Sequence, residues 1–346
     1  MLIFLRPDAD PAARERVLAL LRGEGIRAHS RVAGGFPIVE APPAADPLRD
    51  RIAALPGVER VDTGLAAVRH AEGKIAEGRT GTVVRAGPLS FGDGSFAVIA
   101  GPCAVEGREV LLEIADAVRA AGASMLRGGA FKPRTSPYTF QGLGEEGLRA
   151  LREASERTGL PIVTEVMDAR EIPLVSRHAD LLQVGSRNMQ NFTLLAELGR
   201  QPKPVLLKRG MAATLTEFLA AAEYVLAGGN RQVVLCERGI RTFGEETRNT
   251  LDLAAVPALR TMTHLPVIVD PSHASGRAEL VRPLARAAAA AGADGVMVEV
   301  HVRPEESLCD ARQAILPSEL EALVCECQSI RSLLRSGASL LTEAGA

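Results

Sequence analysis

The chain has no excess of charge of either sign, few cysteines and no long apolar run. Its 346 residues carry a formal net charge of −2, which gives no reason to expect nucleic acid or an anionic membrane as a partner. The five cysteines are too few and too scattered for a disulfide framework. Residues 2–5 are apolar but too short for a signal sequence, and no later segment reaches membrane-spanning length. We therefore expect a soluble, cytoplasmic protein in a reducing compartment.

Lysine is scarce as well. Only four lysines (Lys74, Lys132, Lys203 and Lys208) stand against 36 arginines. Because arginine serves wherever a generic positive charge suffices, a remaining lysine is a candidate for a place that needs a compact ammonium group, able to point at one oxygen or to transfer a proton. Survival by chance is the alternative, and the context of each lysine must decide between the two.

The first 63 residues have the pattern of a small α+β domain. Apolar runs predict four strands, helical spacing predicts two helices, and Gly34 and Gly35 mark a hairpin. The expected order is strand 2–5, helix 10–23, strand 26–32, strand 36–40, helix 47–55 and strand 58–61. This βαββαβ order is that of a ferredoxin-like domain.

Residues 64–83, rich in glycine, alanine and charge, predict a connector to a second domain at 84–346. That domain opens with residues 88–96, where Asp93 and Gly94 predict the turn of a hairpin. Eight short apolar runs follow, each ahead of an amphipathic helix of about 10–15 residues. The runs are residues 96–101, 124–127, 161–165, 181–184, 204–208, 232–236, 266–270 and 295–299.

The apolar runs are continuous rather than alternating, which is typical of parallel strands buried on both faces. Eight such strands with their helices in about 230 residues predict a closed α/β structure, the (β/α)8 barrel. A doubly wound open sheet is the alternative. No Gly-x-Gly-x-x-Gly motif follows a strand, and this disfavours the open sheet.

Each predicted barrel strand ends in at least one ionisable or thiol side chain. In chain order these are Cys103, Arg127, Glu165, Arg187, Lys208, Glu237 with Arg238, Asp270 with His273, and Glu299 with His301. Barrel active sites lie at the carboxyl ends of the strands. Ordinary turn residues would be expected there in a purely structural barrel, so the pattern predicts a catalytic site that binds polyanions.

One subset of these residues has the chemistry of metal ligands. A thiol, an imidazole and two carboxylates suit a borderline divalent ion such as Mn, Fe, Co or Zn. The four are Cys103, His273, Glu299 and, in the loop after the last strand, Asp310. Their spacing matches no recognised metal motif, and a small buried packing residue is the alternative for Cys103.

A second subset is cationic and suits phosphate and carboxylate groups. It comprises Arg127, Lys132, Arg134, Arg187, Lys208 and Arg238. A rim of salt bridges to Glu165, Glu237 and Glu299 is the alternative for part of it. Residues 126–136 are the most specific segment, because a glycine pair lets backbone approach a ligand, Pro133 stiffens the loop, and residues 134–136 offer several donors.

Seven motifs together resemble one known family. They are residues 101–103, 127–136, 183–188, 207–210, 236–239, 270–273 and 298–301. Over residues 84–320 the chain resembles the 3-deoxy-D-arabino-heptulosonate 7-phosphate (DAHP) synthases, in the short microbial form with an N-terminal ferredoxin-like domain. The loop of residues 132–136 looks like the version that takes erythrose 4-phosphate, whereas the related octulosonate 8-phosphate synthases carry Asn and Arg in place of its Pro133 and Arg134.

The resemblance implies a metal-dependent, C–C bond-forming transferase. It condenses phosphoenolpyruvate with erythrose 4-phosphate to DAHP and phosphate, the first step of the shikimate pathway. The implied metal ligands are Cys103, His273, Glu299 and Asp310, with Mn expected and Fe, Co or Zn as alternatives. It also implies a homo-oligomer, dimer or tetramer, and an aromatic amino acid effector at the N-terminal domain. His29 fits a position used by relatives there, whereas Arg31 replaces a smaller polar residue.

The resemblance assigns the remaining side chains to the substrates. Arg187, Lys208, Arg238 and the backbone of Ser186 hold the phosphate of phosphoenolpyruvate, and Arg127 and Lys132 its carboxylate. Arg134, Thr135 and Ser136 bind the aldose phosphate, and Asp270 an aldose hydroxyl. Lys132 is the candidate general acid, and Glu165 with Lys208 the pair that orients the attacking water. Gln183, Glu237 and His301 complete the expected substrate contacts.

Three other functions stay open at this point. The chain is an octulosonate 8-phosphate synthase if arabinose 5-phosphate is its substrate. It is a Schiff-base aldolase if Lys208 acts as a nucleophile on a carbonyl. It is a non-catalytic amino-acid sensor if the N-terminal domain is its active part, although the complete set of metal and phosphate ligands argues against a decayed barrel.

Overall fold

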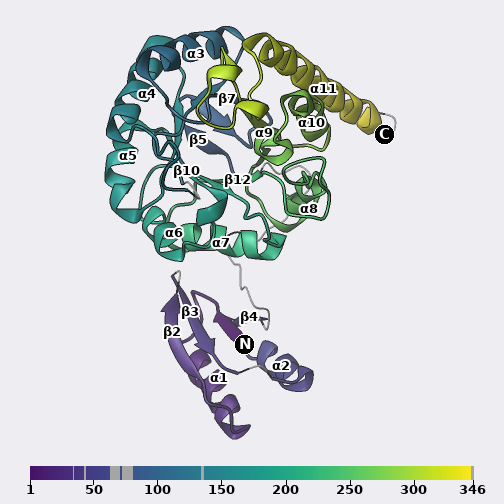
Figure 1. Cartoon of the computed structure of the whole chain (residues 1–346). Helices are drawn as coiled ribbons and strands as arrows, with labels where there is room; N and C mark the ends of the chain where they lie inside the picture. Colours follow the sequence, from purple (N-terminus) through teal and green to yellow (C-terminus); the bar gives the residue numbers. More distant parts are fainter. Residues whose placement is uncertain (34, 43, 63–70, 72–80, 134–135, 344–346) are drawn as a thin grey trace.

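The computed structural model describes residues 1–33, 35–42, 44–62, 71, 81–133 and 136–343 (Figure 1). The N-terminal part is a four-stranded antiparallel sheet in the order β2-β3-β1-β4, with two helices. Its elements are β1 (Leu2–Leu5), α1 (Ala12–Gly23), β2 (His29–Ala33), β3 (Phe36–Glu40), α2 (Asp46–Ala53) and β4 (Val58–Asp62). Ile3, Val17, Leu21 and Ile52 are fully buried between sheet and helices. This is the expected βαββαβ order. The predicted boundary at residue 63 and most of the connector lie outside the described residues.

A hairpin precedes the barrel, but its turn is not where the sequence predicted it. Strands β5 (Val84–Ala86) and β6 (Leu89–Phe91) pair antiparallel across Gly87 and Pro88. Gly87 has φ 59, and a positive φ at the first central position is what a tight type II′ hairpin turn requires. Asp93 instead accepts hydrogen bonds from the backbone and hydroxyl of Ser95 in the loop that follows. The prediction of Asp93 and Gly94 as the hairpin turn is therefore wrong.

Eight parallel strands form a closed barrel, which confirms the predicted fold class. Figure 1 shows the ring of helices around them. The strands are β7 (Ala97–Gly101), β8 (Met125–Arg127), β9 (Ile162–Glu165), β10 (Leu181–Val184), β11 (Val205–Lys208), β12 (Val233–Glu237), β13 (Val267–Val269) and β14 (Gly295–Glu299).

The outer helices vary more in length than the sequence predicted. They are α3 (Arg108–Ala120), α4 (Glu145–Thr158), α5 (Ile172–His178), α6 (Phe192–Leu198), α7 (Leu215–Ala227), α8 (Ala255–Met262), α9 (Pro271–Ser275), α10 (Ala278–Ala290) and α11 (Pro317–Glu343). The seven-residue helices α5 and α6 each follow a short 3-10 turn, at Ala169–Glu171 and Ser186–Asn188. Part of each segment that was predicted as one helix is therefore a 3-10 turn, and the α-helix that follows is shorter than predicted. None of the described helices is long and apolar enough to cross a membrane.

The barrel interior is a packed core. Inward-facing side chains such as Ile99, Met125, Leu206 and Met297 fill it, and Phe91 of the hairpin joins them. The hairpin lies against the amino ends of the strands, because Arg85 donates its backbone N–H to Gln232, which directly precedes β12. One end of the barrel is thereby covered. The carboxyl ends of the strands remain as the place for a site.

Candidate active site

A cavity of 360 Å³ opens at the carboxyl ends of the strands. Its lining includes most of the side chains that the sequence singled out. These are Arg127, Lys132, Ser136, Glu165, Gln183, Ser186, Arg187, Lys208, Arg238, His273 and Asp310. Arg134 and Thr135 lie outside the described residues. Side chains that are far apart in the sequence therefore meet in one cavity, and their contacts indicate what each can do.

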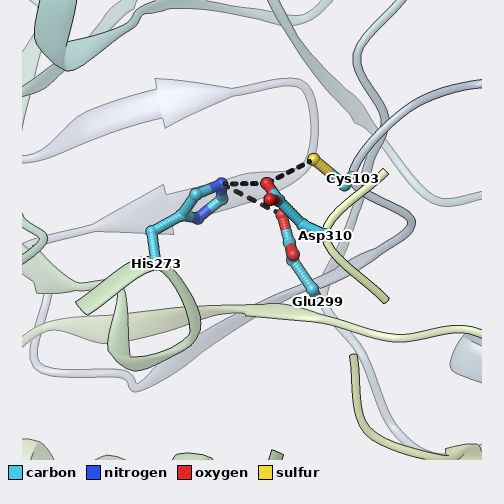
Figure 2. A group of neighbouring side chains, drawn as sticks. All are labelled: Cys103, His273, Glu299 and Asp310. Atoms are coloured by element: carbon cyan, nitrogen blue, oxygen red, sulfur yellow. Dashed lines mark hydrogen bonds and ion pairs between the residues drawn. The ribbon is translucent and has the colours of Figure 1, made fainter. Parts of the chain in front are cut away.

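Four side chains in and below this cavity form a compact cluster (Figure 2). One donor atom from each of Cys103, His273, Glu299 and Asp310 lies within 4.8 Å of the others. The Cys103 Sγ is 3.3 Å from Asp310 Oδ2, and His273 Nε2 is 3.0 Å from Glu299 Oε1. A thiolate, an imidazole and two carboxylates are a donor set that fits a borderline divalent ion. The chemistry of the donors thus agrees with the predicted metal site.

The backbone brings each donor to the cluster in its own way. Glu299 is the last residue of β14, and His273 lies in α9, whose first turn is capped by the Asp270 carboxylate. Cys103 lies two residues after Gly101, the last residue of β7. A Cβ at position 101 would lie 2.2 Å from the carbonyl oxygen of Arg127, so only glycine fits there. Asp310 has φ 57, a left-handed conformation that costs a non-glycine residue energy. Strain of this kind is typical of functional positions.

The protonation of the cluster is set by its burial and by mutual contacts. For the Cys103 thiol, the contact with Cys309, then burial and the charge of Glu299, raise the pKa well above its usual value. For His273, burial lowers the pKa, but the carboxylates of Asp270 and Glu299 outweigh it and raise the pKa to about 9. Thiolate and neutral imidazole are the forms that ligate a metal ion, so binding of a cation would release the protons of these two groups.

Cys309 is a neighbour of the cluster to which the sequence gave no role. Its Sγ lies 2.9 Å from the Sγ of Cys103, and both side chains are buried with Ala104. The contact with Cys103 lowers the pKa of Cys309. In the sequence, only its position directly before Asp310 pointed to a place near the cluster. Nothing in the spacing showed that its side chain would face Cys103.

Asp270 lies beneath the cavity rather than on its surface. It is fully buried, and its Oδ2 accepts from Lys208 Nζ and from His273 Nδ1, the latter at 2.7 Å. Burial alone would raise the pKa of Asp270, but the positive charges of His273 and Lys208 hold it well below its usual value. A carboxylate on the second nitrogen of a ligating histidine fixes the ring orientation. The structure thus gives Asp270 a contact with His273 that the sequence did not predict.

Of three arginines that line the cavity, one is paired with a carboxylate of the described residues and two are not. Arg127 is buried and donates to Glu299 Oε1 at 2.8 Å; burial opposes its charge, but Glu299 outweighs this and raises its pKa. Arg238 is also buried, and burial lowers its pKa. Its Nη1 has no hydrogen-bond partner, and no described carboxylate pairs with it or with the exposed Arg187. Two arginines thus offer unused donors for an anion.

Lys132 reaches from the loop after β8 to the cluster of Cys103, His273, Glu299 and Asp310. Its Nζ donates to the carbonyl oxygen of Cys103 at 2.9 Å and contacts Cys103 Sγ at 3.1 Å. A Cβ on Gly129 would lie 2.7 Å from Lys132 Cδ, so glycine is needed there to admit the side chain. The location of Lys132 between cluster and cavity favours a function over chance survival.

Glu165 and Gln183 lie side by side on the cavity wall. Gln183 Nε2 donates to Glu165 Oε2 at 3.2 Å. A Cβ on Gly185 would lie 2.1 Å from Glu165 Oε1, so this glycine leaves space for the carboxylate. The arrangement holds a carboxylate at the cavity surface, where it can accept a hydrogen bond from water.

Besides Asp270, which was predicted to bind an aldose hydroxyl, two other predicted substrate residues do not line the cavity. Glu237 is fully buried and pairs with Arg209 at 2.8 Å, on the far side of its strand from the barrel interior. His301 is also buried; its Nδ1 accepts from the backbone of Arg303, and its Nε2 is 3.9 Å from a carboxylate oxygen of Glu106. Both side chains contribute to the walls that support the site.

Arg248 was missed by the sequence argument. It lies in the loop between β12 and α8, lines the cavity and donates to Asp310 Oδ1 at 3.2 Å. No motif or spacing set it apart among 36 arginines, so only its contacts reveal it.

The fold and this site define a class of protein. A closed barrel carries a cavity with unused cationic donors next to a cluster suited to a divalent metal ion. This combination is that of a (β/α)8-barrel enzyme acting on anionic substrates.

Comparison with known proteins narrows the class to one family. A model of the DAHP synthetase I family matches residues 79–336. The phospho-2-dehydro-3-deoxyheptonate aldolase of Thermotoga maritima is 52% identical over 253 residues, which are 73% of this chain and 75% of that protein. A crystal structure of a DAHP synthase from T. maritima covers 96% of this chain and 97% of its own, at 42% identity and a TM-score of 0.76.

A second group of relatives is more distant. The 2-dehydro-3-deoxyphosphooctonate aldolase of Geobacter sulfurreducens is 29% identical over 262 residues, which are 70% of this chain and 95% of that protein.

The chain belongs to the DAHP synthetase I family. This confirms the resemblance inferred from the seven motifs.

Proposed function

We propose that this chain condenses phosphoenolpyruvate with erythrose 4-phosphate to give DAHP and phosphate, the first step of the shikimate pathway. The observation that carries the proposal is the joining of two features in one cavity. Arg187 and Arg238 offer donors that no described carboxylate uses, and the Cys103 cluster lies beside them. Two anionic substrates need such cations, and an aldehyde carbon needs activation for attack. Membership in the DAHP synthetase I family supports the same reaction.

The proposed reaction forms one carbon–carbon bond and releases one phosphate. C3 of phosphoenolpyruvate attacks the aldehyde carbon, and the aldehyde oxygen takes a proton, for which Lys132 is the proposed donor. Water adds to C2, and the hemiketal phosphate then loses phosphate to leave a ketone. Glu165 and Lys208 line the cavity and are proposed to orient the water. The arginines mainly supply positioning, which is worth up to ~7–11 kcal/mol in favourable cases.

The proposed metal ligands are Cys103, His273, Glu299 and Asp310. When bound, a divalent ion supplies Lewis-acid polarisation of the aldehyde carbonyl. We propose Mn as the ion, with Fe, Co or Zn as alternatives, because the donor set combines a thiolate with two carboxylates.

The substrate binding we propose follows from the cavity lining. Arg187, Lys208, Arg238 and the Ser186 backbone bind the phosphate of phosphoenolpyruvate, and Arg127 with Lys132 its carboxylate. Ser136, which also lines the cavity, binds the aldose phosphate together with Arg134 and Thr135.

Erythrose 4-phosphate is expected to be the preferred aldose. We expect kcat/KM with erythrose 4-phosphate to exceed that with arabinose 5-phosphate by ~10- to 200-fold, the range for substrates that differ by one carbon unit. The measurement is loss of phosphoenolpyruvate with Mn present, with chelator-treated protein as the blank. A preference for arabinose 5-phosphate would instead make the chain an octulosonate 8-phosphate synthase. The relatives named 2-dehydro-3-deoxyphosphooctonate aldolase from Geobacter sulfurreducens and a Cyanothece strain are 29% and 30% identical to this chain.

The Schiff-base alternative conflicts with the contacts of Lys208. Its Nζ is ion-paired with the buried carboxylate of Asp270. Schiff-base formation needs this nitrogen to attack a carbonyl carbon, and the contact with Asp270 occupies it. Borohydride treatment in the presence of pyruvate should therefore leave the mass of the protein unchanged.

The N-terminal domain is proposed to regulate or assemble the enzyme rather than to catalyse. The residues proposed for catalysis all lie in the barrel, from Cys103 to Asp310. An aromatic amino acid effector must bind two states of the enzyme with different affinity to inhibit it. We also propose a homo-oligomer, dimer or tetramer, in which paired N-terminal domains close over the barrel mouth.

Deletion of residues 1–63 should leave an active barrel that ignores tyrosine and phenylalanine. We expect kcat to stay within about threefold of the full-length value, because no proposed catalytic group is lost. Turnover with and without each amino acid is the measurement. Inhibition of the truncated protein by tyrosine would place the effector site on the barrel, and a full-length enzyme insensitive to both amino acids would leave only the assembly role.

A further inference from the structure

The two oxygens of Glu299 have different partners. Oε1 faces the cluster, where it accepts from Arg127 and lies 3.0 Å from His273 Nε2. Oε2 points away and accepts from Gln313 Nε2 at 2.7 Å. Gln313 is 2% exposed, so this hydrogen bond is shielded from water. Oε1 is therefore the oxygen that lies among the other cluster donors, whereas Oε2 is occupied by Gln313.

The two oxygens of Asp310 are divided in the same way. Oδ2 faces the cluster, 3.3 Å from Cys103 Sγ and 3.9 Å from His273 Nε2. Oδ1 points outward and accepts from Arg248 Nη1 at 3.2 Å. Because Asp310 has φ 57, its backbone conformation is strained and needs neighbouring contacts to persist.

Gln313 and Arg248 also contact each other. The same Arg248 Nη1 donates to Gln313 Oε1 at 3.3 Å. Since Nη1 carries only donors, the amide of Gln313 must turn its oxygen toward Arg248 and its nitrogen toward Glu299. The opposite orientation would place an oxygen 2.7 Å from a carboxylate oxygen. A continuous chain of hydrogen bonds therefore runs from Glu299 through Gln313 and Arg248 to Asp310.

The backbone of Arg248 connects this chain of hydrogen bonds to α9, the helix that carries His273. Its N–H donates to the carbonyl oxygen of Ser275, the last residue of α9, at 2.9 Å. The next residue, Asn249, donates its backbone N–H to Ala274 and its side chain to the carbonyl oxygen of His273 at 3.3 Å. The segment that presents Arg248 is thus fixed to the helix that presents His273.

We propose that Gln313 and Arg248 are positioning residues for the metal site. Together they hold Glu299 and Asp310 so that each carboxylate offers a single oxygen to the ion. Partners of this kind orient ligands, and their loss typically weakens metal binding ~10- to 100-fold. The inference rests on the proposed metal site and adds to it the residues that preorganise it.

The test compares Mn affinity in matched variants of the full-length chain. Gln313→Met keeps the side-chain length but removes both hydrogen bonds, and Arg248→Met removes the donor at the other end. Arg277→Met is the control. Arg277 lines a second cavity together with Arg248 and Gln313, but it pairs with Glu279 and has no ion pair with Glu299 or Asp310 among the described residues. The dissociation constant for Mn is measured from the free-ion electron paramagnetic resonance signal, and the melting temperature is recorded for each protein.

We expect ~10- to 100-fold weaker Mn binding for Gln313→Met and Arg248→Met, and wild-type binding for Arg277→Met. Because both residues belong to one chain of hydrogen bonds, the double variant should bind no more weakly than the weaker single variant. The Arg248 side chain is 41% exposed, so Arg248→Met keeps the test available if Gln313→Met does not fold.

Two outcomes overturn the inference and are distinguishable. If the wild type binds Mn and the two variants bind it equally well, the positioning role is wrong while the proposed metal site stands. If the wild type binds no divalent ion, the proposed metal site and the inference fall together.

Discussion

Replacement of Cys103 by alanine should remove metal-dependent turnover, with kcat/KM reduced by about 1000-fold or more. Lewis-acid stabilisation of developing charge is worth several kcal/mol, and each 1.36 kcal/mol changes a rate about tenfold. Cys103 is 4% exposed, and its Sγ is the one soft donor among the four cluster atoms. Alanine leaves a carboxylate-rich site with three donors. Metal content by elemental analysis and turnover with added Mn are the two measurements.

The remaining cysteines supply controls for this experiment. Cys327→Ala changes a cysteine of the hydrophobic core outside the cluster, and should leave metal content unchanged. Cys309→Ala removes the neighbour of Cys103 but none of the four cluster donors, so activity should survive. Full activity of chelator-treated wild type, or of Cys103→Ala, would contradict the metal role.

Lys132→Arg should lower kcat by ~100- to 10,000-fold, the range for loss of a general acid. The Nζ of Lys132 lies within 3.1 Å of both the carbonyl oxygen and the Sγ of Cys103, in a pocket that Gly129 leaves barely wide enough. A guanidinium keeps the charge but neither fits this space nor releases its proton readily. Steady-state kinetics with both substrates is the measurement.

Lys203→Arg is the matched control for Lys132→Arg, because Lys203 lies in the loop before β11 and outside the cavity lining. Its kcat should equal that of the wild type within experimental error. Equal and mild effects at both positions would show that Lys132 survived by chance, and would remove it as the proposed proton donor.

The barrel could be predicted because its strands are buried on both faces. Continuous apolar runs, each ending in an ionisable residue, are visible without any partner information. The direction of each side chain was harder to read. Cys236 faces the barrel interior, so the next residue, Glu237, must face the outer helices, where it meets Arg209. Applying that alternation to the strand would have removed Glu237 from the predicted substrate contacts.

Other features depend on contacts between distant segments. Gln313 and Glu299 are separated by a loop that contains the left-handed Asp310, and Arg248 reaches Gln313 and Asp310 from another strand's loop. No periodicity in the sequence encodes such a meeting. The hairpin turn was misplaced for a different reason: two glycine-containing turns lie close together, and only the pairing of β5 with β6 decides between them.

Because the amino end of the barrel is covered, ligands must bind and leave at the other end. The hairpin β5–β6 joins the packed interior, so molecules enter and leave the cavity through the opposite opening. Anything that lies across this opening at the carboxyl ends of the strands slows the binding and the release of a ligand together. Association and dissociation rate constants then fall by the same factor, and the affinity for the molecule inside is unchanged. Such an obstacle does not change the dissociation constant obtained from an equilibrium titration. It changes only the rate constants obtained from the time course of binding.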